Sequence, residues 1–355
     1  MEENIFFYNR KNQSGSNNNG LILGTPGSGK TFLAQKEIIN VLKNTDDEVY
    51  VIDTTGEYSC LLESVNGQEI MIDYRLNNFI NPMDMDINYF NIDDPLFLKK
   101  DFIIALFESL INNNSSITIL QKSIIDRCVK ILYKEYLEHM EEIKNEEITC
   151  DLQASPILSD LYNILMQQYE SEAHELAILL KPLIASPYDT FTHKTNIKIN
   201  SRFVIFNLKN IGCYSENLAT LSVLNFIWNR IKENQKKRKT TWIYIDELYS
   251  LIKTKSSALF LSEIWKQSRT NFGIITGITI NTKDMLLIKE ARSILVNTNY
   301  LYIFRQYLFD AKNLAKLYDL NEEQLNYITE NYNTEKDYGN CLSIAKSNIT
   351  TFKIS

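Results

Sequence analysis

A glycine-rich segment near the start of the sequence carries the clearest chemical signal. Residues 24–31 read Gly-Thr-Pro-Gly-Ser-Gly-Lys-Thr, the complete phosphate-binding loop pattern. An apolar run at 21–23 predicts a strand before the loop, and the pattern of 32–42 predicts a helix after it. This order of strand, loop and helix is the context in which the pattern binds a nucleoside triphosphate. The residues that we expect to contact ATP are Gly24, Thr25, Pro26, Gly27, Ser28, Gly29, Lys30, Thr31 and Phe32.

The chemistry of this loop follows from its residue types. Glycines let the backbone curl so that several amide groups point at the phosphates, and the helix that follows presents its positive end to the same charge. We expect Lys30 to reach the β- and γ-phosphates and Thr31 to hold Mg²⁺.

An acidic pair far downstream supplies the second signal. Residues 241–245 form a β-rich apolar run that ends in Asp246 and Glu247. Strand ends of this kind face the ligand crevice of an open α/β sheet. We therefore expect Asp246 to bind Mg²⁺ and Glu247 to orient and polarise the attacking water. Alone, the pair also fits a strand that ends at a solvated turn; together with the loop it indicates nucleotide hydrolysis.

Composition indicates a large globular intracellular chain. Its 355 residues, 44% of them hydrophobic, can bury a substantial core in one large domain with an insertion, or in two lobes. A net charge of -7 argues against nonspecific coating of nucleic acid but leaves a local basic patch open. No apolar stretch reaches membrane-spanning length, and Glu2 and Glu3 stand where a signal peptide has positive charges.

Cysteine and histidine spacing predicts no metal site. The five cysteines are scattered and odd in number, so we expect free, mostly buried thiols in a reducing compartment. The three histidines do not converge on a zinc pattern. These residues are Cys60, Cys128, Cys150, Cys213, Cys341, His139, His174 and His193.

Strand-like and helix-like segments alternate along much of the chain. Strands are predicted at 21–23, 48–53, 69–73, 202–208, 241–245, 273–279 and 299–304, with two edge strands at 341–345 and 349–354. Helices are predicted at 32–42, 96–111, 119–140, 159–169, 172–180, 216–233, 257–269 and 282–290. This alternation predicts an α/β fold with a mostly parallel sheet. We divide the chain into 1–93, with a polar linker at 12–20 and the phosphate loop, an all-α insertion at 94–200, and 201–355.

An ordered series of segments resembles the C-terminal motor domain of the conjugative-transfer ATPases of type IV secretion systems. The resemblance extends from about 5 to 352 and is strongest to the branch in conjugative elements of Gram-positive bacteria, within the FtsK and HerA group. The segments are 21–58, with Val51-Ile52-Asp53 and Gly56-Glu57-Tyr58, then 80–84, 122–128, 245–247, 264–266 and 276–279.

This resemblance implies a RecA-like P-loop ATPase that uses ATP and Mg²⁺. It implies a cytoplasmic protein, peripheral at the inner face of the plasma membrane, that works as a homo-oligomer and is hexameric when active. Such a motor energises channel or pilus assembly and substrate passage. The implied partners are other channel proteins and the coupling ATPase, and direct DNA contact stays open. Full-length members carry an additional N-terminal anchoring domain, so we expect an excised motor domain or a short paralogue.

The sequence departs from the family pattern at two places near the expected site. The strand at 273–279 usually ends in Thr-Gln, where the glutamine senses the γ-phosphate, but here Thr279 is followed by Ile280 and Asn281. An isoleucine cannot hydrogen-bond a phosphate or a water molecule. After Asp53 the family commonly has Pro-Glu, and this chain has Thr54 and Thr55. We expect nucleotide binding to be intact and hydrolysis to be slow.

Arg269 is the best candidate for an arginine finger, a cation that one subunit supplies to the nucleotide of its neighbour. An exposed helix-end arginine is an equally good interpretation. Arg305, after the next strand, is the second candidate. Glu57 fits either a role in positioning water or a turn carboxylate without function.

Two further features are interpreted as structural. The basic run at 236–239 favours a solvated helix end over a nucleic-acid contact, because cations are stabilised near a helix C-terminus. Trp228 and Trp265 have apolar neighbours at helical spacing, which favours a core position over stacking on bases.

Two rivals to the secretion motor remain. One is a translocase of the same superfamily that pumps DNA directly, which needs a basic channel lining. The other is an ATP-binding scaffold whose sensor has decayed to Ile280.

Overall fold

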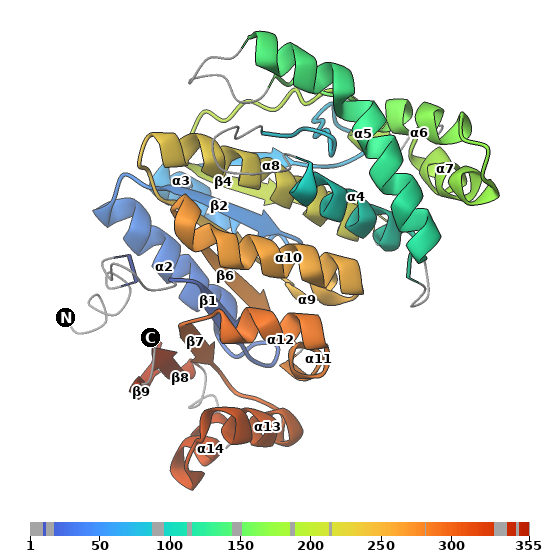
Figure 1. The fold of residues 1–355 in the computed structure, drawn as a ribbon. Coiled ribbons are helices and arrows are strands. Elements are labelled where there is room, and N and C mark those ends of the chain that lie inside the picture. Colours follow the sequence, from blue (N-terminus) through green and yellow to red (C-terminus); the bar gives the residue numbers. More distant parts are fainter. Residues whose placement is uncertain are drawn as a thin grey trace.

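One nine-stranded sheet organises the protein (Figure 1). The computed structural model describes residues 10–11, 18–86, 96–111, 116–143, 151–184, 189–212, 215–280, 282–329, 339–345 and 348–354. The strand order is β3-β4-β2-β5-β6-β1-β7-β8-β9. Neighbours from β3 to β7 are parallel, and β8 and β9 add an antiparallel edge. The predicted α/β fold class with a mostly parallel sheet is confirmed.

The strands lie where the sequence predicts them, within one or two residues. Six are almost continuously apolar and fully buried, as expected for strands covered on both faces. The strands are β1 (Gly20–Leu23), β2 (Glu48–Asp53), β3 (Gln68–Met71), β4 (Phe203–Asn207), β5 (Thr241–Ile245), β6 (Gly273–Thr279), β7 (Tyr300–Ile303), β8 (Asn340–Ala345) and β9 (Asn348–Lys353).

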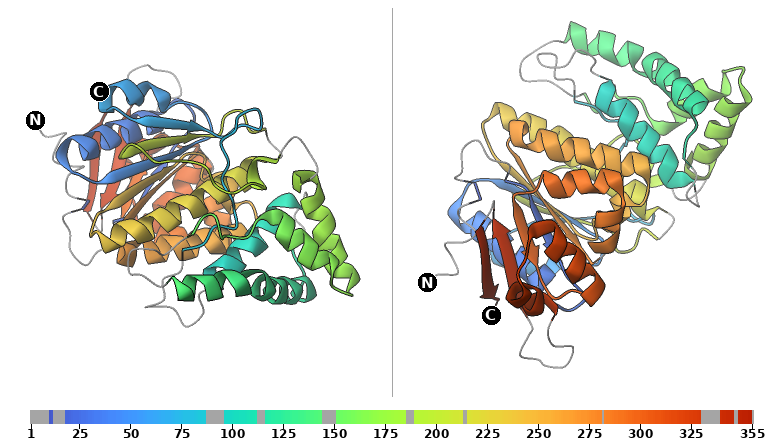
Figure 2. Two further views of the ribbon diagram at one scale, coloured as in Figure 1. Left: turned by 90° about the horizontal axis from the view of Figure 1, so that it is seen from above. Right: turned by 60° about the horizontal axis from the view of Figure 1, so that its bottom comes forward.

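Helices cover both faces of the sheet, with one core on each side (Figure 2). Alternate residues of β1 divide between them: Ile22 packs on the side of α2, and Leu21 and Leu23 on the side of α8 and α10. The helices are α2 (Lys30–Asn44), α3 (Leu62–Val65), α4 (Phe97–Leu110), α5 (Ile119–Glu142), α6 (Leu158–Met166), α7 (Ser171–Ile184), α8 (Glu216–Lys236), α9 (Tyr249–Ile252), α10 (Lys255–Ser268), α11 (Thr282–Leu287), α12 (Lys289–Val296), α13 (Leu308–Tyr318) and α14 (Glu322–Thr329). Trp228 and Trp265 are buried in the core, as predicted.

The structure corrects the helix assignment in the last third of the chain. The single helix predicted at 282–290 is two helices, because Ile288 between α11 and α12 has an extended backbone. The sequence analysis missed α13 and α14. Helix α13 buries only Asp310, Ala311 and Leu314, which is too narrow a stripe to give a clear helical period.

Helices α4 to α7 lie between β3 and β4 in the chain, on the side of α8 and α10 (Figure 1). Helix α4 packs against α8 and α10, so the apolar core of these helices continues into that of the sheet. The predicted boundary at 93/94 and most of the linker at 12–20 lie outside the described residues, and the division into three segments stays a prediction.

No helix in the described part of the chain is long and apolar enough to cross a lipid bilayer. Cys128 and Cys341 are buried free thiols, and Cys60 is an exposed one. Cys150 and Cys213 lie outside the described residues.

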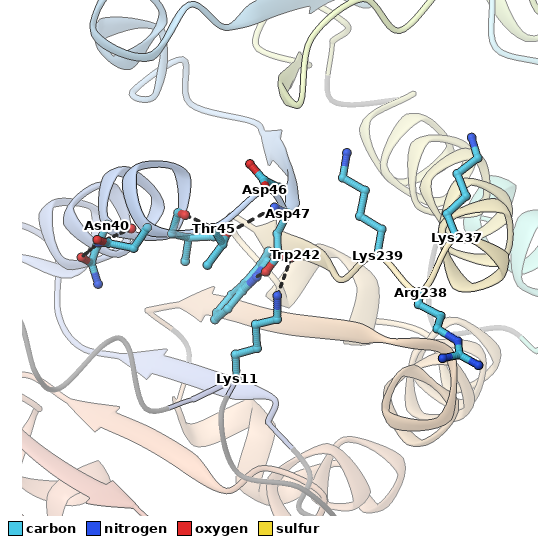
Figure 3. Close-up of a pocket in the computed structure, with 11 residues that line it drawn as sticks. Lys11, Asn40, Thr45, Asp46, Asp47, Lys237, Arg238, Lys239 and Trp242 are labelled. Carbon is cyan, nitrogen blue, oxygen red and sulfur yellow. Dashed lines mark hydrogen bonds and ion pairs between the residues drawn. The ribbon is translucent and has the colours of Figure 1, made fainter.

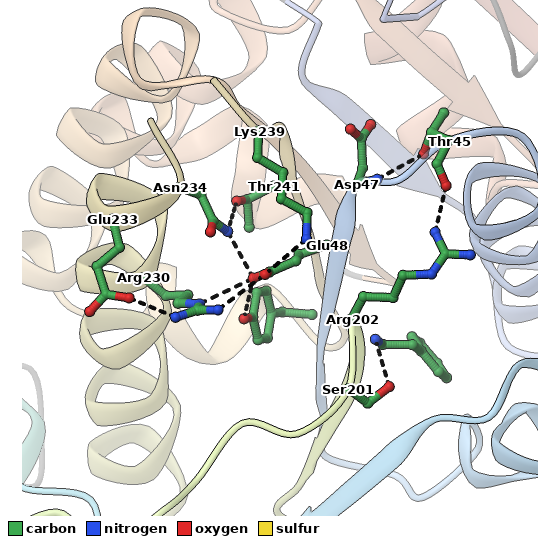
Figure 4. Close-up of polar contacts among 12 residues, drawn as sticks. Thr45, Asp47, Glu48, Ser201, Arg202, Arg230, Glu233, Asn234, Lys239 and Thr241 are labelled. Atoms are coloured by element: carbon green, nitrogen blue, oxygen red, sulfur yellow. Dashed lines mark hydrogen bonds and ion pairs between the residues drawn. The ribbon is translucent and has the colours of Figure 1, made fainter. Parts of the chain in front are cut away.

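A buried carboxylate fixes the start of β2 against α8 (Figure 4). Glu48 accepts hydrogen bonds from Arg230 (both 3.1 Å), Asn234 (2.8 Å), Tyr50 (2.7 Å) and Lys239 (3.2 Å). Burial alone favours the neutral acid, but these donors outweigh it and lower the pKa of Glu48 from 4.5 to about 2. A folded-state pKa below the ordinary value stabilises the fold above pH 4.5, and this stabilisation is lost as the pH falls toward 2.

We predict that Glu48→Gln lowers the free energy of unfolding by about 3 kcal/mol at pH 7, because it removes the buried charge that pairs with the half-buried Arg230 and Lys239. The difference from wild type should shrink as the pH is lowered from 5 toward 3. Urea unfolding across this range measures it. Glu138→Gln is the matched control, since Glu138 is 63% exposed and 4.0 Å from Lys134. Equal losses from the two variants would contradict the prediction.

Candidate nucleotide site

The glycine-rich segment forms a tight loop between β1 and α2. Gly29 has a φ of 109° and Gly27 a φ of 68°, a left-handed backbone that side chains other than glycine rarely adopt. Gly24 lies against two neighbours: an added Cβ would come within 2.7 Å of Phe304 Cβ and of Ser28 Oγ. The loop conformation therefore depends on glycine at these positions.

Internal hydrogen bonds hold the loop closed. The Ser28 hydroxyl donates to the Thr25 carbonyl at 2.8 Å, and Lys30 Nζ donates to the same oxygen at 3.0 Å. The Lys30 side chain is buried, which lowers its pKa, while the nearby carboxylates of Glu247, Asp246 and Glu57 act in the opposite direction. Lys30 is thus a buried cation that faces several acids.

A buried ion pair supports the helix behind the loop. Glu37 lies two turns into α2, and its carboxylate accepts from Arg10 Nη1 at 2.6 and 2.8 Å and from the Tyr244 hydroxyl at 2.9 Å. The Arg10 guanidinium lies 5.3 Å from the ring centres of both Trp242 and Tyr300. No sequence pattern predicts this contact, because charged side chains such as these are seldom fully buried.

The acidic pair follows β5, which lies next to β6 in the middle of the sheet. Asp246 is 5% exposed, and its backbone N–H donates to the Ile52 carbonyl at 3.0 Å. Glu247 has a φ of 48°, which is uncommon for a side chain other than glycine and is found at strained functional positions. Loop and acidic pair line one cleft of about 350 Å³ together with Glu57.

The electrostatics of the cleft favour a bound cation. Burial raises the pKa of Asp246, the nearby Glu247 and Asp53 add to this effect and a hydrogen bond from Thr55 opposes it, so that the pKa is about 7. Burial likewise raises the pKa of Glu247, with Glu216 and Glu57 adding to it and Lys30 opposing it. Acidic side chains therefore outnumber basic ones in the lining of the cleft.

Oxygen donors in the cleft fit Mg²⁺. The Thr31 hydroxyl and the Asp246 carboxylate line the same space, and Mg²⁺ prefers hard oxygen ligands. Within the described residues no group of three or more His, Cys, Asp or Glu could hold a metal. Mg²⁺ at nucleotide sites commonly takes its other ligands from phosphates and water.

Thr55, which the sequence analysis names only as a departure from the family pattern, is a site residue. Its hydroxyl lies 3.0 Å from Asp246 Oδ2 and 3.2 Å from Asp53 Oδ1. Asp53 in turn accepts from the backbone N–H groups of Thr55 (3.1 Å), Gly56 (2.7 Å) and Tyr58 (3.0 Å). Asp53 followed by Gly56 three residues later is a pattern typical of turns. This pattern could have predicted the turn, but not the contact of Thr55 with Asp246.

Ile280 lines the same cleft and is half-buried. Its apolar side chain thus lies where the sequence analysis expects it, beside the space for the phosphates. Asn281, the alternative sensor, lies outside the described residues.

The two candidate arginines lie at opposite edges of the sheet. Arg269 follows α10 and precedes β6, so it is at the amino edge, exposed and away from the cleft of its own chain. Arg305 follows β7: its Nε donates to Thr25 Oγ1 at 3.2 Å, and its carbonyl accepts from the Thr25 N–H at 2.8 Å. Of the two, only Arg305 touches the phosphate loop of its own chain.

Comparisons with known proteins agree with this geometry. The model of the TraG P-loop domain family matches residues 2–353. VirB4 of Thermoanaerobacter pseudethanolicus superposes with a TM-score of 0.79 at 22% identity, over 97% of this chain and 91% of that one. The plasmid coupling protein TrwB in complex with ADP and Mg²⁺ superposes with a TM-score of 0.59 at 14% identity, over 95% and 84%. At 22% and 14% sequence identity, these structural similarities show a shared fold. A search of curated proteins found no match.

We predict that Thr55→Val, which removes the hydroxyl that contacts Asp246, raises the Mg²⁺ concentration needed for half-maximal ATP binding on the order of tenfold. Thr55→Ser keeps the hydroxyl and should behave as wild type. A fluorescent ATP analogue titrated with Mg²⁺ measures the effect. Binding in the absence of Mg²⁺ should be equal in all three proteins, and a loss there would indicate general damage to the loop.

Proposed function

The chain belongs to the TraG P-loop domain family, and from this premise we propose that it is an ATP-hydrolysing motor of a conjugative type IV secretion system. The observation that supports hydrolysis most directly is the single cleft that Lys30 shares with Asp246 and Glu247. The phosphate loop alone would be enough to bind a nucleotide. The loop and the two carboxylates together can position the attacking water and stabilise charge, which is what phosphoryl transfer to water requires.

In this proposal the loop binds the triphosphate. Backbone amides of 27–31 and the start of α2 face the phosphates, and the Lys30 ammonium exchanges its contact with the Thr25 carbonyl for the β- and γ-phosphates. Thr31 and Asp246 hold Mg²⁺, which offsets the phosphate charge when bound. Thr55 orients the Asp246 carboxylate.

Glu247 serves as the base. Its side chain lies in the cleft without an ion pair in the described part of the chain. The carboxylate accepts a proton from the attacking water as the water oxygen bonds to the γ-phosphorus and the bond to the ADP oxygen breaks. Because its pKa is raised, it is a stronger proton acceptor than an ordinary glutamate in its ionised form.

The motor is proposed to assemble. This chain resembles the structures of VirB4 and of the plasmid coupling protein TrwB. We infer a homo-oligomer at the inner face of the membrane, in contact with other channel proteins. Arg269 then serves the nucleotide of a neighbouring copy, since it faces away from its own.

We predict that Glu247→Gln binds ATP and Mg²⁺ normally but lowers turnover about 100-fold or more, because an amide is a far poorer proton acceptor. Lys30→Ala should instead weaken ATP affinity about tenfold or more, because it removes a charged hydrogen bond to the phosphates. Steady-state phosphate release and fluorescent-nucleotide binding separate the two effects. Turnover at the wild-type rate in Glu247→Gln would move the role of base to another carboxylate, such as Glu57.

A second candidate function is an ATP-binding scaffold that does not hydrolyse ATP. Ile280 favours it, because this residue places an apolar side chain beside the space for the phosphates.

If the protein is instead a motor, we predict that its basal hydrolysis is slow and that Ile280→Gln accelerates it on the order of tenfold, because the substitution adds a hydrogen-bonding group beside the phosphates. ATP affinity should change little, and Ile280→Leu should behave as wild type. Arg269→Ala should cancel much of the gain if Arg269 acts across a subunit boundary. A rate that Ile280→Gln leaves unmoved would show that another group already senses the phosphate.

A further inference from the structure

A hollow of about 540 Å³ lies between α13 and the helix pair α11 and α12, next to one another in Figure 1. Exposed apolar side chains line it: Val296 on α12 is 82% exposed, and Phe309 and Leu317 on α13 are 61% and 52% exposed. The half-buried Leu286 and the buried Leu295 line it as well. We call this surface the α13 hollow. Contiguous exposed apolar side chains of this kind mark a place where another molecule binds.

The residue spacing of α13 explains why this surface is uncovered. Ala311 and Leu314 belong to the narrow stripe that the helix buries in the core. Phe309, Asn313 and Leu317 follow one another at intervals of four, so they form a second, largely apolar stripe on another side of the helix. The helix therefore has a free face against which a further helix can pack.

Cations surround the apolar side chains of the hollow. Lys283, Arg292 and Lys316 line it from three different helices, and all three are exposed. Lys283 Nζ lies 6.0 Å from the Phe309 ring centre, and Arg292 Nε donates to the Leu286 carbonyl. None of the three cations has an ion pair within the described residues, and no described side chain that lines the hollow is acidic. Cations of one sign in one place attract an acidic partner.

A larger hollow, of about 600 Å³ at the amino edge of the sheet, lacks these properties (Figure 3). Among the described residues that line it, the apolar ones are Val41 and Trp242, which are only 4% and 1% exposed. Asp46 and Asp47 also line it, and Lys11 pairs with Asp47 at 2.7 Å. It offers neither an exposed apolar stripe nor charge of one sign, so the α13 hollow is the better docking surface.

We propose that the α13 hollow binds an amphipathic helix of another protein, with apolar side chains in the hollow and acidic side chains facing Lys283, Arg292 and Lys316. Helices bind grooves in this way, through apolar side chains at helical spacing. The inference rests on the proposed function, which includes contact with other channel proteins, and names the surface and the chemistry of such a partner. Among the described residues, none lines both this hollow and the nucleotide cleft.

The shape of the hollow favours a helix over a lipid surface. Apolar side chains that protrude can enter a bilayer, whereas Leu295 is only 4% exposed and Leu286 is half-buried. A partner with protruding side chains of its own can contact both. A symmetric contact with a second copy is disfavoured, because the cations of one hollow would face those of the other.

The test uses the full chain and a designed peptide of roughly 18 residues, long enough to form a helix. The peptide has Leu at positions i, i+3, i+4 and i+7 and Glu on either side of this stripe. Fluorescence anisotropy of the labelled peptide should show binding that weakens with salt. A peptide of the same composition in scrambled order should bind at least tenfold more weakly, because its apolar side chains no longer share one face.

Removal of exposed apolar side chains locates the contact. Phe309→Ser combined with Leu317→Ser should weaken peptide binding at least tenfold. The matched control is Ile131→Ser with Ile178→Ser, two apolar residues that are 50% and 63% exposed elsewhere on the surface, and it should bind the peptide as wild type. ATP affinity and the circular dichroism spectrum should be unchanged in both variants.

A charge swap tests the rim of the hollow. Lys283→Glu combined with Lys316→Glu should lose affinity for the Glu peptide and gain affinity for a peptide with Lys in place of Glu, because opposite charges then face each other again. Lys130→Glu with Lys134→Glu, two cations on α5 that are 60% and 74% exposed, should behave as wild type toward both peptides.

Three results would overturn the proposal. The first is a wild type that binds ATP but not the Glu peptide, or equal losses in test and control variants. The second is binding of phosphatidylglycerol vesicles, but not of the peptide, that the Lys283 and Lys316 reversal abolishes. The third is self-association in sedimentation velocity, without peptide binding, that the Phe309 and Leu317 variant abolishes. A wild type that binds the peptide but not ATP would instead contradict the proposed function and leave the docking surface in place.

Discussion

The placement of β6 between β1 and β5 is the constraint on which the site depends. β1 ends at the phosphate loop and β5 ends at the acidic pair, and both run parallel to β6, with Ile22 opposite Ile278 and Ile245 opposite Gly277. Gly277 makes this close approach feasible, since an added Cβ would come within 2.6 Å of Leu248 and 3.0 Å of Leu21. Loop and carboxylates therefore meet at one edge although they lie far apart in the chain.

Buried charges hold the elements around this edge at defined positions. Arg10 and Glu37 fix α2 behind the loop, and Glu48 fixes the start of β2 against α8. A buried ion pair that loses one partner is strongly destabilising, so both pairs select one arrangement of helix and sheet. The cleft differs, because within the described residues Asp246 and Glu247 have no ion pair and their pKa values are raised. A bound divalent cation would relieve this excess of negative charge.

The two edges of the sheet thus have different roles. The carboxyl edge gathers the loop, the acids and Ile280, and the amino edge presents Arg238 and Arg269. The apolar side chain of Ile280 and the Thr55 hydroxyl beside Asp246 line the same cleft. In the proposed motor, turnover would therefore depend on how Asp246 and Glu247 are held.

The strands, the phosphate loop and the acidic pair could be predicted from the amino-acid sequence. Each is a local pattern, since apolar runs, glycines and terminal carboxylates reflect the burial and backbone needs of their own segment. The linear chain could not show contacts between distant segments. Only the tertiary structure decided that Thr55 reaches Asp246, that Arg10 is buried against Glu37, and that Arg305 rather than Arg269 touches the loop of its own chain. Those contacts depend on strand order and on which edge each turn occupies, and no local pattern encodes either.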